Sequence, residues 1–256
     1  MKAKVLLVDI ETAPIEGFVW GLWENNLSLN QIKTDWNMLS WAAKWLDKPK
    51  VMYDDASKTP RNDKRISKSL AALIKEADIV ITHNGISFDR KKWNARFIKH
   101  RMKPPKDFKH IDTLRIAKKH FAFTSNKLEY LAEFLNAKFK KLQHKEFPGF
   151  ELWTECLKKN KRAWAEMKKY NIHDVLVLEQ VYKMLIPWEP AIDFSIYEDD
   201  CKLLCSCGSK SFKKDGHQYT TTTKRQRYEC LRCGRASYGK INLLTTEQKL
   251  TLKSRK

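Results

Sequence analysis

The stretch VLLVDIET, residues 5–12, runs from four apolar side chains into two acids that stand one position apart. Side chains in a β-strand alternate between its two faces, so Asp9 and Glu11 point to the same side. Neighbouring carboxylates repel each other and are costly to remove from water. The stretch is therefore either a strand that ends in solvent or a pair of ligands for Mg²⁺ or Mn²⁺, which favour carboxylate oxygens.

The composition indicates a polyanionic partner. The 256 residues include 50 Lys and Arg against 30 Asp and Glu, a net charge of +20, and residues 201–256 hold 14 of the basic residues against 3 acidic ones. Such an excess favours nucleic acid, the alternative being a well-solvated basic surface. The apolar start is too short for a signal peptide, and no apolar run approaches the roughly 20 residues that cross a bilayer. We expect a cytoplasmic protein with no membrane partner.

The periodicity along the chain predicts an α/β fold. Strands are expected near 4–11, 18–24, 38–46, 51–56, 78–84 and 107–113, and helices at 61–77, 89–101, 113–120 and 161–185, with Asn126 as the cap of one more helix. This order predicts a mixed sheet flanked by helices on both faces. The domain would span residues 1–186. Residues 187–200 contain two prolines without helical periodicity and indicate a linker.

Two further stretches carry acids in places where sites form. In ITHNGISFDRKKW, Asp89 follows a strand and a turn and opens a helix. It either caps that helix or belongs to a site at the carboxyl end of the strand. In KYNIHD, Tyr170 and Asp174 are four residues apart and share one helix face. They are either a hydrogen-bonded core pair or part of the same site.

Taken in order, VDIET, HNGISFD and YNIHD resemble the three exonuclease motifs of the DEDD superfamily of 3′–5′ exonucleases. The resemblance covers residues 1–186 and is to the tyrosine subclass, because the histidine subclass would place His where this chain has Lys169. It is similar to the proofreading domains of family B DNA polymerases and to stand-alone exonuclease-like proteins of phages and bacteria. HIDTL, residues 110–114, also looks like a segment of this family, with Asp112 in a structural role.

The resemblance implies a ribonuclease H-like fold and a two-metal-ion hydrolysis that releases nucleoside 5′-monophosphates. Asp9, Glu11, Asp89 and Asp174 would bind two Mg²⁺ or Mn²⁺ ions, and Tyr170 would orient the attacking water. Asn84 would contact the substrate strand or brace its turn. Single-stranded DNA is the first choice of substrate, with RNA open. The rivals are a structure-directed endonuclease of the same fold and a non-catalytic nucleic-acid-binding or accessory protein of replication or recombination.

The segment 201–240 resembles a zinc ribbon. Its two knuckles, C-x-C-G and C-x-x-C-G, contain Cys205, Cys207, Cys230 and Cys233, and four thiolates suit one structural Zn²⁺. The first knuckle lacks the usual two-residue gap, so Cys201 or His217 is a substitute ligand. Basic residues alternate here with aromatic ones, which indicates nucleic-acid contacts by Lys210, Lys213, Lys224, Arg225 and Arg227. Residues 241–256 would form a basic tail.

Overall fold

The computed structural model describes residues 3–23, 25–139, 146–189, 194–197 and 203–250. The chain divides into two compact units, one of Lys4–Tyr182 and one of Met1–Ala3 with Lys183–Lys256. Each unit has its own sheet. Within the described residues no helix is both long and apolar enough to cross a membrane.

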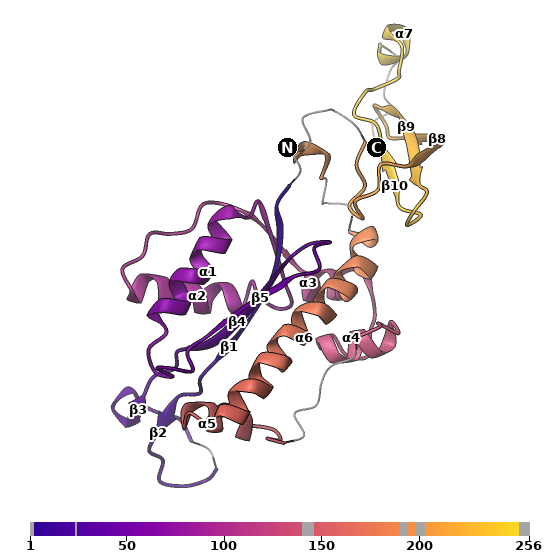
Figure 1. Cartoon of the computed structure of the whole chain (residues 1–256). Coiled ribbons are helices and arrows are strands. Elements are labelled where there is room, and N and C mark those ends of the chain that lie inside the picture. Colours follow the sequence, from indigo (N-terminus) through magenta and orange to yellow (C-terminus); the bar gives the residue numbers. More distant parts are fainter. Residues whose placement is uncertain (1–2, 24, 140–145, 190–193, 198–202, 251–256) are drawn as a thin grey trace. The chain divides into compact units, whose positions relative to one another are not determined.

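The first unit is built on a mixed five-stranded sheet. Strand β1 (Val5–Thr12) pairs antiparallel with β4 (Met38–Trp45) and parallel with β6 (Ile79–Thr82). Strands β5 (Val51–Asp55) and β7 (Lys109–Asp112) complete the order β5-β4-β1-β6-β7, of which β5, β4 and β1 are labelled in Figure 1. The α/β class with a helix-flanked mixed sheet is confirmed.

Alternation along β1 and β4 assigns the two faces of this sheet. Val8, Ile10 and Trp41 join the apolar core beneath α1 (Lys64–Glu76) and α2 (Asp89–Lys99), and the Trp41 indole donates to the Ile66 carbonyl at 3.0 Å. The opposite face meets α6 (Lys161–Leu185), the long diagonal helix in Figure 1, through a buried ion pair between Lys44 and Glu179. Asp9 and Glu11 therefore face α6.

The shorter elements lie between these. They are β2 (Glu16–Gly17), η1 (Leu29–Gln31), β3 (Ile32–Thr34), α3 (Thr113–His120), α4 (Leu128–Phe134) and α5 (Glu151–Leu157). The predicted cap at Asn126 is wrong, because α4 has Lys127 at its N-cap without a side-chain hydrogen bond there. The Asn126 carbonyl instead accepts a hydrogen bond from His83 Nε2 at 2.9 Å.

The predicted strand at 18–24 is also wrong within its described part. Residues 18–23 belong to no strand, the chain bends at 20–23, and Phe18, Trp20 and Trp23 are 68%, 101% and 86% exposed. A strand needs a partner, and the β2–β3 pair ends at Gly17 and Ile32 before these residues can join it. An apolar composition typical of a buried strand thus occurs on an exposed loop.

The second unit contains a three-stranded antiparallel sheet in the order β10-β9-β8. Its elements are η2 (Ile186–Trp188), η3 (Ser195–Tyr197), β8 (Phe212–Tyr219), β9 (Lys224–Cys230), β10 (Ala236–Tyr238) and α7 (Thr246–Lys249). The described part of the predicted linker thus consists of two short 3₁₀ turns with the residues beside them.

Candidate active site and cysteine cluster

Three carboxylates converge where β1 ends beside the middle of α6. One oxygen each of Asp9, Glu11 and Asp174 lie within 4.8 Å of one another. Asp9 and Glu11 stand opposite Ala42 and Ser40 in the ladder with β4, so both leave the same face of β1, and Asp174 comes from the helix on that face. Three converging carboxylates are the donor set that Mg²⁺ or Mn²⁺ prefers.

The electrostatics of this cluster favour a bound cation. Burial, followed by the charges of Glu11, Asp174 and Asp89, raises the pKa of Asp9 well above its usual range, and a hydrogen bond from Asn171 only partly opposes this. Mutual repulsion in a poorly solvated place is costly without a counter-charge. A divalent cation would remove that cost, so the residues fit such an ion.

Asp89 lies next to this cluster rather than within it. It is the first residue of α2 and is 4% exposed, and its Oδ1 accepts from the Ile10 amide at 3.3 Å. Burial and the charge of Asp112 raise its pKa to about 7 against backbone hydrogen bonds that lower it. The structure thus brings three predicted carboxylates together and places the fourth against the backbone between Asp9 and Glu11.

Tyr170 lies one helical turn before Asp174 and is buried. Its hydroxyl donates a hydrogen bond to the Asp174 carboxylate, and burial together with the charges of the nearby carboxylates raises its pKa above the usual value. The phenol therefore stays protonated at neutral pH. It can donate a hydrogen bond but cannot act as a general base there.

Two residues that hold the carboxylates in place were missed by the sequence analysis. The buried Asn171 amide donates to Asp9 Oδ2 at 2.5 Å and accepts from the Ser40 hydroxyl at 3.1 Å. The Trp153 indole donates to Glu11 Oε2 at 3.0 Å. Asn171 stands inside YNIHD, so the motif contained a signal. Trp153 is 142 positions from Glu11, on the unpredicted helix α5, and no local pattern indicates that contact.

The turn before Asp89 is held by Asp112. Its carboxylate accepts from the amides of Asn84 and Ile86 at 2.8 and 3.1 Å. Asn84 adopts a positive φ of 64°, and a Cβ at Gly85 would lie 2.2 Å from the Thr82 hydroxyl, so this position requires glycine. The Asn84 backbone therefore braces the turn. The Asn84 side chain is exposed, and its contact with nucleic acid stays a prediction.

In the second unit the four predicted cysteines meet. The sulfur atoms of Cys205, Cys207, Cys230 and Cys233 lie within 4.8 Å of one another. Each knuckle is closed by a hydrogen bond from its glycine amide to the carbonyl of its first cysteine, from Gly208 to Cys205 at 2.8 Å across three residues and from Gly234 to Cys230 at 2.9 Å across four. Both glycines have positive φ angles, 82° and 72°. The shortened first knuckle thus still brings its two thiols into the cluster.

The chemistry of the four thiols suits a soft, tetrahedral ion. Although burial acts to raise it, the amides of Arg232 and Cys233 bring the pKa of Cys230 down to about 7. Of the two substitute ligands, His217 lies in β8 with its ring 6.1 Å from that of Tyr219, and Cys201 falls outside the described residues.

The predicted nucleic-acid contacts lie on the strands beside this cluster. Lys213 is in β8, and Lys224, Arg225 and Arg227 are in β9, while Lys210 is in the irregular segment between the first knuckle and β8. Two of these cations already have carboxylate partners. Lys213 pairs with Glu229 at 2.9 Å, and Arg227 pairs with Asp215 at 3.0 Å. A phosphate would have to compete with both acids.

Comparison with known proteins gives one family and one fold. A family model described as RNase_H superfamily matches residues 33–186, a range that contains Asp89, Tyr170 and Asp174 and begins after Glu11. The family B DNA polymerase from the hyperthermophilic archaeon Pyrobaculum calidifontis has a similar fold, with a TM-score of 0.56 and 16% identity over 73% of this chain and 25% of that chain. This chain thus spans about a quarter of the polymerase. No curated protein matches it.

Proposed function

Since the chain belongs to the RNase H superfamily, we propose that it is a metal-dependent 3′–5′ exonuclease of the tyrosine subclass of the DEDD superfamily. The observation that carries this proposal is the meeting of Asp9, Glu11 and Asp174 within 4.8 Å, beside a protonated Tyr170. The motif resemblance to proofreading domains and the fold likeness to a family B DNA polymerase support the same conclusion.

Asp9, Glu11 and Asp174 would hold one Mg²⁺ or Mn²⁺ ion. Asp89, the first residue of α2, would be a ligand of a second ion. Bound there, such ions supply Lewis-acid activation of water and neutralise charge on the phosphoryl oxygens. Asn171 keeps the Asp9 carboxylate oriented through its 2.5 Å hydrogen bond. With a metal ion on the Asp174 carboxylate, the Tyr170 hydroxyl would turn from Asp174 and donate its one hydrogen bond toward the attacking water or the phosphate, which would orient the reactants for in-line hydrolysis.

The favoured substrate is single-stranded DNA, with RNA as the second choice. Discrimination between them depends on contacts with the 2′-hydroxyl. The basic strands of the second unit would hold the nucleic-acid backbone, and the four cysteines would bind one structural Zn²⁺. Four protein ligands leave no open position on such an ion, so its role would be to order the unit.

The test uses 5′-labelled single-stranded DNA and RNA with Mg²⁺, Mn²⁺ or a chelator. We expect a metal-dependent ladder that shortens from the 3′ end and releases nucleoside 5′-monophosphates. Asp9→Asn should lower the rate by about a thousandfold, because it removes a ligand charge worth several kcal/mol in the transition state. Asp54→Asn, at an acid paired with Arg65 on the surface, is the matched control.

Other outcomes identify the rivals. Internal cleavage without a 3′ ladder would indicate the endonuclease of the same fold. Tight binding of the DNA and the RNA, with no cleavage of either in Mg²⁺ or Mn²⁺, would reject the exonuclease and favour the non-catalytic binding protein.

A further inference from the structure

A cavity of about 560 Å³ opens beside the carboxylate cluster. It is lined by Thr12 at the end of β1 and Ala13–Ile15 after it, by Trp36, by Lys92 of α2, by Gly149 and Phe150 just before α5, and by Trp153 within α5. The volume lies in the range of small-molecule sites, which are also mostly apolar with a few polar groups. No step of the proposed hydrolysis uses this cavity.

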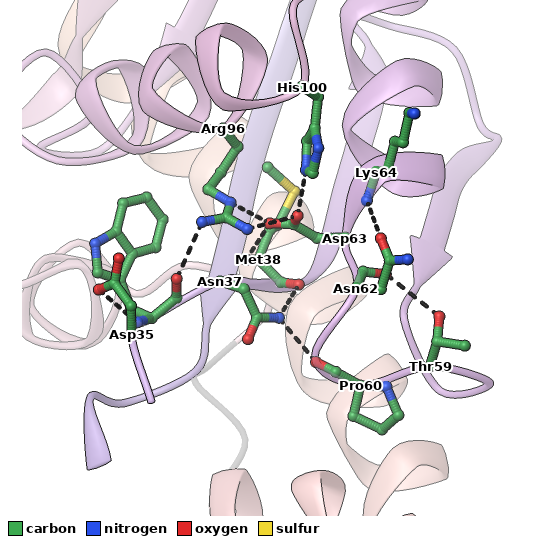
Figure 2. A network of polar contacts seen from close by, with 11 residues as sticks. Asp35, Asn37, Met38, Thr59, Pro60, Asn62, Asp63, Lys64, Arg96 and His100 are labelled. Atoms are coloured by element: carbon green, nitrogen blue, oxygen red, sulfur yellow. Dashed lines mark hydrogen bonds and ion pairs between the residues drawn. The ribbon is translucent and has the colours of Figure 1, made fainter. Parts of the chain in front are cut away.

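The Trp36 wall is held by a buried polar network (Figure 2). Arg96 donates to the Trp36 carbonyl at 3.2 Å and makes two hydrogen bonds to Asp63 at 2.5 and 2.8 Å. Asp63 is fully buried and also accepts from the Met38 amide at 2.8 Å. The Lys92 ammonium lies 3.7 Å from the centre of the Trp36 ring. The hydrogen bond to its carbonyl thus holds the backbone of Trp36 in place beside the cavity.

The Trp153 wall is joined to the catalytic carboxylates. Its indole lines the cavity and donates to Glu11 at 3.0 Å. Its ring also meets the Tyr170 ring edge to face, with centroids 6.0 Å apart and planes at 78°. One side chain therefore contacts the ligand space, a carboxylate of β1 and the tyrosine of α6.

A flat, aromatic, negatively charged ligand matches this combination. Indole and phenyl rings stack on nucleobases of any sequence, and the Lys92 ammonium, which lines the same cavity, supplies a positive charge that attracts a phosphate. Building on the proposed nuclease function, we propose that the cavity binds one nucleobase of the substrate strand and that Trp153 is a positioning residue that ties this base to Glu11. Filling the cavity would then hold the Trp153 ring, and with it the Glu11 carboxylate, in the metal-binding arrangement.

The base subsite is tested by binding rather than cleavage. The full chain is titrated, with Ca²⁺ present, into short 5′-labelled single-stranded oligonucleotides that each lack one base near the 3′ end. We expect wild type to lose about tenfold in affinity when one particular base is missing. Trp36→Leu should bind the complete oligonucleotide about tenfold more weakly and show no further loss at that position.

Phe150→Leu, on a side chain that is 64% exposed, should reduce the same penalty without disturbing the core. Trp188→Leu, at an exposed tryptophan outside the cavity, is the control that should keep the wild-type pattern. If wild type ignores every missing base, or if Trp36→Leu keeps the wild-type pattern, the subsite is rejected. A protein that binds in this way but never cleaves would reject the exonuclease and leave the subsite standing.

The link to Glu11 is tested by Mn²⁺ binding without nucleic acid. Trp153→Phe keeps an aromatic wall but loses the indole N–H, and we expect the Mn²⁺ Kd to rise about tenfold, as for other partners of metal ligands. Trp164→Phe is the matched control, because it also loses one indole hydrogen bond, to the Cys156 carbonyl at 2.9 Å, without touching Glu11. Equal Mn²⁺ affinity in wild type and Trp153→Phe, with folding confirmed by circular dichroism, would overturn the positioning role.

Discussion

At the scale of single residues, Asp89 shows how the site opposes stability. Its pKa of about 7 in the folded protein lies above the ordinary value of 3.8, chiefly because it is buried. Between these two pH values the folded state binds more protons than the unfolded state, so the free energy of unfolding falls as pH rises. This penalty is complete above pH 7 and absent below pH 4 in the metal-free protein.

Asp89→Asn keeps an acceptor for the Ile10 amide but cannot ionise. With a chelator present, we expect the free energy of unfolding of the variant to exceed that of wild type by roughly 2 to 4 kcal/mol at pH 7.5. Near pH 4 the two free energies should be equal. Thermal unfolding across this pH range measures the difference. Asp78→Asn should show the opposite trend, because hydrogen bonds from Lys4 and Lys106 lower the pKa of Asp78. If the free energies of unfolding of Asp89→Asn and wild type differ by the same amount at every pH, the expectation is contradicted.

The sequence showed which residues of this site could ionise but not all of those that position them. Asp9 and Glu11 share a strand face, and Tyr170 and Asp174 share a helix face, so short spacings were enough to pair them. Asn171 lies within YNIHD, but only Tyr170 and Asp174 of that motif were assigned roles from the sequence. Trp153 and Glu11 meet only because α5 packs near the end of β1, and such a contact has no local signature.

At the scale of elements, a buried ion pair ties Arg96 of helix α2 to Asp63 at the start of α1, and Asp63 also accepts from the Met38 amide of β4. Arg96 and Asp63 are 4% and 0% exposed, and hydrogen bonds from Arg96 and His100 lower the pKa of Asp63 although burial opposes this. Removing one partner of such a pair leaves a charge that nothing nearby fully neutralises. The network should therefore be more important for stability than the surface pairs of the same unit.

We expect Arg96→Met to lower the free energy of unfolding by about 3 kcal/mol, near the low end for a buried pair because His100 still contacts Asp63. Arg65→Met removes a pair with Asp54 whose arginine is 64% exposed, and should cost about 1 kcal/mol or less. Urea unfolding followed by tryptophan fluorescence compares the two. Similar costs for both variants would mean that burial does not decide the strength of this pair.

The elements themselves were largely predictable where apolar periodicity meets a packed partner. The helices at 64–76, 89–99 and 161–185 lie within or close to the predicted ranges, as do β1, β4, β5, β6 and β7. The failed strand at 18–24 has a physical cause. The loop with Trp20 is as apolar as a strand, yet whether an aromatic segment finds a partner strand depends on the rest of the fold.

At the scale of the whole molecule, two units with separate sheets need separate sources of stability. The unit of Lys4–Tyr182 has a large apolar core, whereas the described part of the other contains three short strands and few buried apolar side chains. Small domains of this kind usually depend on a metal or on disulfides. The four clustered thiols are free cysteines, so the proposed Zn²⁺ would provide that stability.

We expect one Zn²⁺ per chain and, after its removal by a strong chelator, loss of folded structure confined to the second unit. Limited proteolysis should then cleave within residues 203–250 and leave a resistant fragment containing Lys4–Tyr182.

Single-stranded DNA binding should weaken and lose part of its salt dependence, because the basic strands β8 and β9 would no longer be ordered. Cys233→Ser should reproduce these effects, and Cys156→Ser, at a buried cysteine of the first unit, should keep the Zn²⁺. If removing the ion leaves residues 203–250 resistant to protease, the hydrogen bonds of the three strands are sufficient without it, and a structural role for zinc is wrong.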